Sequence, residues 1–136
     1  MGTALRKKDE MEMSLLKRFG LRISILAAWG ESLRSKGIDV PPVVDKTLAR
    51  ARVKISSGCF TACDVGCDLG RIEGALTSAA GSAGEEGADQ WLELLADCMS
   101  ENAPVDEIVK KIEFPAVKMH YNRFNFDCVC GDCDAG

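Results

Sequence analysis

Apolar residues recur at helical spacing through most of the first 111 residues of this 136-residue chain. Over residues 8–35 the periodic apolar positions are Leu15, Leu16, Phe19, Ile23, Leu26 and Leu33. A stripe with this period is typical of an amphipathic helix. Gly37 follows the last periodic residue, and glycine is a common C-terminal stop. We therefore expect one long first helix, long enough to be the spine of a helical bundle.

Shorter segments with the same helical pattern follow the first one. They span residues 42–57, 62–79, 88–100 and 104–111. Thr61 and Asp64 have the spacing of a capping box, which predicts a new helix start after Thr61. The alternative is one helix that continues through Gly58, because a single glycine costs a helix only about 1 kcal/mol. Pro115 is expected to end the last of these segments.

These segments predict an all-α fold, a compact bundle of four or five helices with a long N-terminal helix. Residues 1–113 form the helical domain in this prediction. Residues 114–136 form an aromatic and cysteine-rich tail, which has room to dock on the bundle. No apolar run approaches the roughly 18 residues that a membrane-spanning helix needs. We therefore expect no membrane association.

The third predicted helix is rich in small residues. Gly66, Gly70 and Gly74 recur every four residues, and together they cost roughly 3 kcal/mol of helix propensity relative to alanine. Close packing of two helix backbones along this stripe would offset that cost. The alternative is that the glycines leave room for a ligand beside the neighbouring cysteines.

Charge is distributed unevenly along the chain. The net charge is −4, but residues 1–54 carry 12 basic and 6 acidic residues, whereas residues 55–102 carry 1 basic and 9 acidic residues. One interpretation is that basic and acidic helices pack side by side. The other is a basic face for an anionic partner, made of Lys46, Arg50 and Lys54 at i, i+4 and i+8. The net negative charge and the lack of nearby aromatic residues make nucleic acid an unfavoured partner.

Seven cysteines carry most of the remaining chemical information. Because seven is odd, they cannot all pair as intramolecular disulfides. A chain of this length with several apolar helices does not need a disulfide framework to fold. Six of the first twelve residues are charged, and this segment lacks the apolar block of a secretory signal. We therefore expect a cytoplasmic protein with reduced thiols.

The tail brings three cysteines into a C-x-C-x-x-C motif, formed by Cys128, Cys130 and Cys133. A C-x-x-C turn can place two sulfurs on one tetrahedral metal, and thiolates suit zinc or an iron–sulfur cluster. A fourth ligand would come from His120, Cys98 or the helical cysteines. The alternative is an acidic tail whose thiols bind nothing.

A second group of cysteines lies near the start of the third predicted helix, where Cys59, Cys63 and Cys67 recur every four residues. On a straight helix, i and i+4 thiols can share a metal, but i and i+8 lie about 12 Å apart along the axis. A chain break at Gly58 would let Cys59 fold back toward Cys63. Cys63 would then lie in the first turn, where the helix dipole favours a thiolate for redox or nucleophilic chemistry. The alternative is that these cysteines pack as small apolar side chains.

These observations favour a binding or regulatory adaptor over an enzyme. In this hypothesis the adaptor holds zinc or an iron–sulfur cluster through its cysteines, and it acts on a protein partner or as a homodimer. The first alternative is a thiol or iron–sulfur redox enzyme that uses the helical cysteines. The second is a protein associated with nucleic acid through its basic face.

Overall fold

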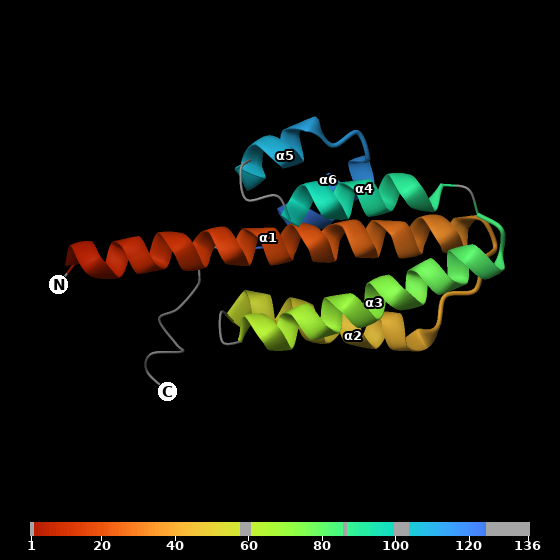
Figure 1. Cartoon of the computed structure of the whole chain (residues 1–136), viewed down its shortest axis with the longest axis horizontal. Helices are drawn as coiled ribbons and strands as arrows, with labels where there is room; N and C mark the ends of the chain where they lie inside the picture. The colour runs from red at the N-terminus through yellow and green to blue at the C-terminus, as the bar shows by residue number, and fades with distance from the viewer. Residues whose placement is uncertain (1, 58–60, 86, 100–103, 125–136) are drawn as a thin grey trace.

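The computed structural model describes residues 2–57, 61–85, 87–99 and 104–124, and within these ranges it contains six helices and no strand (Figure 1). They are α1 (Gly2–Ser35), α2 (Pro42–Ser57), α3 (Ala62–Ser82), α4 (Ala88–Met99), α5 (Val105–Lys111) and α6 (Pro115–Asn122). The all-α prediction is confirmed. The expected number of four or five helices is wrong, because the described residues form six.

The additional helix, α6, lies in the segment that was expected to form only a tail. Pro115 occupies its first turn, where proline has the right φ and needs no backbone donor. Val117, His120 and Tyr121 are buried, and α6 packs against α1. Pro115 therefore starts a helix as well as following one, and a short amphipathic pattern is enough to dock it.

The centre of the bundle is α1, which the other helices surround. Figure 1 shows α2 and α3 along one side of α1, with α4 and α5 on the other. Every residue from 19 to 30 except Arg22 is buried. The buried Ser24 hydroxyl donates to the Gly20 carbonyl oxygen within the helix, at 2.8 Å, so its polar group is satisfied. Neither α1 nor any other helix in the described ranges is long and apolar enough to cross a membrane.

An aromatic cluster joins α1 to α4 and to the connection before α6. Trp29 of α1 is fully buried, and its ring stacks on Trp91 of α4 with a centroid distance of 6.5 Å and an angle of 8° between the planes. Phe114 also packs against Trp91, with the ring centroids 4.5 Å apart and the planes tilted by 32°. The cluster therefore holds α4 and the start of α6 on the central helix.

Helices α2 and α3 are separate, as the Thr61 signal predicts. Thr61 has an extended backbone, and its hydroxyl oxygen accepts a hydrogen bond from the Asp64 amide at 3.2 Å. In a full capping box the Asp64 carboxylate would accept a hydrogen bond from the Thr61 backbone amide. Here that carboxylate pairs with Lys54 of α2 instead. The cap therefore both starts α3 and ties it to α2.

The glycine stripe of α3 faces open space rather than another helix. A Cβ added at Gly66, Gly70 or Gly74 would meet no atom within 4 Å outside the helix itself. The prediction of close backbone packing along this stripe is therefore wrong. The opposite, apolar face of α3 enters the core through Val65, Leu69, Ile72 and Leu76. That burial, and not glycine contacts, offsets the poor helix propensity of α3.

Replacement of Gly70 by Ala should therefore stabilise the protein. Gly70 is exposed and has room for a methyl group, so the change removes a helix penalty of up to about 1 kcal/mol. Gly37→Ala is the matched control, because Gly37 has a φ of 81° that alanine adopts only with strain. Urea unfolding followed by circular dichroism measures both. A loss of stability in Gly70→Ala would contradict the open environment.

Candidate functional site

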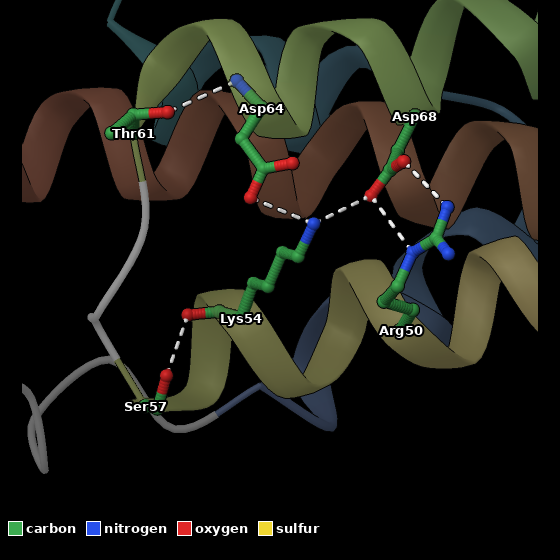
Figure 2. Close-up of polar contacts among 6 residues, drawn as sticks. All are labelled: Arg50, Lys54, Ser57, Thr61, Asp64 and Asp68. Carbon is green, nitrogen blue, oxygen red and sulfur yellow. Dashed lines mark hydrogen bonds and ion pairs between the residues drawn. The ribbon is translucent and has the colours of Figure 1, made fainter.

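Two of the three basic residues on the predicted face of α2 pair with acidic residues of α3 (Figure 2). Arg50 Nη2 donates to Asp68 Oδ1 at 2.8 Å. Lys54 Nζ donates to Asp68 Oδ2 at 3.0 Å and pairs with Asp64 Oδ2 at 2.8 Å. Lys46, the third residue, is exposed. The prediction that basic and acidic helices lie side by side is thus confirmed for α2 and α3.

Asp68 is the buried centre of this network, with a side chain only 4% exposed. Burial alone raises the pKa of a carboxyl group. The hydrogen bonds and positive charges of Arg50 and Lys54 outweigh burial, so the pKa of Asp68 lies below its ordinary value of 3.8. Asp68 therefore stays ionised at neutral pH and holds α2 against α3.

The cysteines divide into two environments. Cys63 and Cys67 are exposed free thiols one turn apart on α3, so the prediction that they pack as small apolar residues is wrong. Cys98 of α4, predicted as a possible fourth metal ligand, is instead buried, and its thiol donates to the Arg18 carbonyl oxygen of α1 at 3.3 Å. Cys59 and the tail cysteines Cys128, Cys130 and Cys133 lie outside the described residues.

Burial keeps the Cys98 thiol protonated. Desolvation raises the pKa of Cys98 to about 12, and the charges of Arg22 and Arg18 lower it only in part. A thiol in this state is a poor metal ligand and a poor nucleophile. Cys98 therefore acts in packing α4 on α1.

His120, predicted as a possible metal ligand, has both ring nitrogens in hydrogen bonds. Arg52 Nη2 of α2 lies 3.0 Å from His120 Nδ1, and Glu31 Oε1 of α1 lies 2.7 Å from Nε2. A guanidinium can only donate, so Nδ1 accepts and the proton resides on Nε2, which donates to Glu31. The two hydrogen bonds fix the orientation of the imidazole between the Arg52 guanidinium and the Glu31 carboxylate.

The Glu31–His120–Arg52 chain lines a cavity between α1, α2 and α6. The cavity has a volume of about 270 Å³. In the sequence, His120 is 68 residues from Arg52 and 89 residues from Glu31. No local spacing predicts this arrangement, and the single histidine was the only signal that could have drawn attention to it.

Among the described residues, no group of three or more His, Cys, Asp or Glu side chains is arranged to hold a metal ion. Cys63 and Cys67 supply two thiols, which is half of a tetrahedral site. Comparison with known proteins finds no match among family models, curated proteins or solved structures.

Proposed function

We propose that this protein is a small helical adaptor that binds one thiolate-ligated metal ion, zinc or the iron of an iron–sulfur cluster. The observation that carries the proposal is the exposure of Cys63 and Cys67, one turn apart on the outer face of α3. Free cysteine is among the most buried residue types, so two exposed thiols on one helix face are unusual. A rise of about 6 Å over four residues lets both sulfurs reach one metal ion.

The remaining ligands in this proposal are thiolates outside the described residues. Cys59 and the tail motif Cys128, Cys130 and Cys133 offer more than the two sulfurs still needed. His120 is not part of the proposed ligand set, because Arg52 and Glu31 already engage its two nitrogens. A reduced, cytoplasmic setting is part of the proposal, since the ligands must be thiolates.

The open glycine face beside the two thiols supports an adaptor role. Gly66, Gly70 and Gly74 add no side chains along this stripe of α3, which gives a partner protein or a second copy access to the metal. We propose no nucleic-acid role for Lys46, Arg50 and Lys54, because Arg50 and Lys54 are already paired with acidic residues of α3.

The test is the metal content of the purified full chain after reduction and reconstitution with zinc or with iron and sulfide. We expect about one metal site per chain, as four thiolates around one centre require. The double variant Cys63→Ser/Cys67→Ser should lose most of the metal, as should the tail variant Cys128→Ser/Cys130→Ser/Cys133→Ser. Cys98→Ser is the control and should bind metal normally, because Cys98 lies in the core.

The same experiment separates the alternatives. Iron with visible absorbance would favour the cluster, and colourless zinc the mononuclear site. A metal-free protein in which Cys63 and Cys67 cycle between thiols and a disulfide would support the thiol redox alternative. Full metal binding by the Cys63→Ser/Cys67→Ser variant would contradict the proposed ligand set.

A further inference from the structure

The cavity between α1, α2 and α6 combines apolar walls with a few charged side chains. Its 270 Å³ equals the liquid volume of about nine water molecules. Ala27, Val44 and Leu48 give it apolar walls, and Arg52 and Arg123 bring positive charge to it. Apolar walls with a few placed polar groups are typical of binding sites for small organic ligands.

Arg52 differs from the neighbouring arginines Arg34 and Arg50 in its lack of a carboxylate partner. Arg34, at the same cavity, binds Asp45 with two hydrogen bonds of 3.0 and 2.6 Å, and Arg50 pairs with Asp68. Within the described residues, Arg52 pairs with no carboxylate, and its Nη2 lies 3.0 Å from the ring nitrogen Nδ1 of His120. Its Nε is buried and has no hydrogen-bond acceptor there.

A partly buried guanidinium without a counter-ion is costly, because the charge loses water and gains no partner. A ligand carboxylate in the cavity would supply the missing negative charge. Guanidinium donors match the two oxygens of a carboxylate, which makes such pairs strong and directional.

The neighbouring residues hold Arg52 ready for such a ligand. His120 Nδ1 accepts one of its N–H groups, and Glu31 keeps the His120 proton on the far nitrogen. His120 thus orients the Arg52 guanidinium without neutralising its positive charge. With His120 neutral, three arginines face only Glu31 and Asp45 around the cavity, so its lining carries net positive charge.

We propose that this cavity binds a small organic carboxylate with a short apolar chain, held by Arg52 and lying against Ala27, Val44 and Leu48. The carboxylate meets the donors of Arg52, and the chain fills the apolar part of the cavity. Arg123, at the end of α6, adds positive charge from the other side. This site is separate from the thiols of α3 and does not depend on metal.

The test uses the ¹⁵N-labelled full chain and three probes: butyrate, its neutral isostere butyramide, and inorganic phosphate. We expect butyrate to shift the amide signals of Glu31, Ala49 and His120, and butyramide to leave them unchanged at the same concentration. Isothermal titration should show butyrate affinity at least tenfold lower in Arg52→Gln. Lys46→Gln is the matched control, since it removes one charge from α2 outside the cavity.

A second variant keeps the proposal testable if Arg52→Gln does not fold. Ala49 lines the cavity and is solvent-exposed, so Ala49→Trp should fill the cavity and abolish butyrate binding while Arg52 stays in place. Equal binding of butyrate and butyramide, no binding of either, or equal losses in Arg52→Gln and Lys46→Gln would overturn the proposal. Tighter binding of phosphate than of butyrate would overturn the carboxylate assignment.

Discussion

Trp29→Ala should destabilise the protein by about 3–5 kcal/mol, the usual cost of emptying a large aromatic site in a core. Trp29 is fully buried in α1 and stacks on Trp91, which in turn contacts Phe114. Removing the indole leaves a cavity where α4 and the start of α6 meet the central helix. Urea unfolding at neutral pH measures the loss.

Trp29→Phe is the informative companion to this variant. The Trp29 Nε1 group is buried and has no acceptor among the described residues, and such a group costs about 1–3 kcal/mol. Phenylalanine keeps an aromatic ring against Trp91 and removes this N–H, so the smaller cavity is partly compensated. We expect Trp29→Phe to lose less than half of what Trp29→Ala loses. Equal losses would show that the ring contact with Trp91 is unimportant.

Asp68→Asn should have the second largest effect, a loss of about 1–3 kcal/mol at pH 7, because it removes the buried anion from a hydrogen-bonded network. Arg50 and Lys54 both bond this carboxylate between α2 and α3. Asp64→Asn is the control. Asp64 is half-exposed and bonds Lys54 alone, so its loss should stay below about 1 kcal/mol.

The effect of Asp68 should also depend on pH. The folded-state pKa of Asp68 is depressed below 3.8, so the stabilisation is fully present above that value and is lost as the pH falls through the folded pKa. The difference in unfolding free energy between wild type and Asp68→Asn should therefore be constant near neutrality and shrink below about pH 4. A difference that persists unchanged at low pH would contradict the ionic role of Asp68.

The sequence predicts helix positions well where proline or glycine marks the same helix ends as the apolar period. Residues 42–57 were predicted as a helix and match α2, because Pro42 can start a helix and Gly58 follows its end. The sequence does not predict the helix after Pro115, since its apolar pattern is short and proline commonly ends a helix. The burial of Val117 and Tyr121 on α1 makes α6 a helix, and that is a tertiary effect.

The candidate sites were harder to predict for a related reason. The glycine repeat shows that the three glycines share one face of α3. It does not show whether that face points to the core or to solvent, which depends on the apolar residues of the opposite face. The exposure of Cys63 and Cys67 follows from the same orientation. The contacts of His120 with Arg52 and Glu31 join three helices, and no residue spacing encodes such a meeting.

The position of α1 has a consequence for how the protein is made on the ribosome. The helix that all others enclose is also the first of the described helices to be synthesised. The stretch from Ser35 to Asn122 takes roughly 4–17 s to translate at about 5–20 residues per second. Throughout that interval the apolar surface of residues 19–30 lacks α6, one of its main partners. Until α6 is added, part of this apolar surface is therefore uncovered, and uncovered apolar surface favours aggregation.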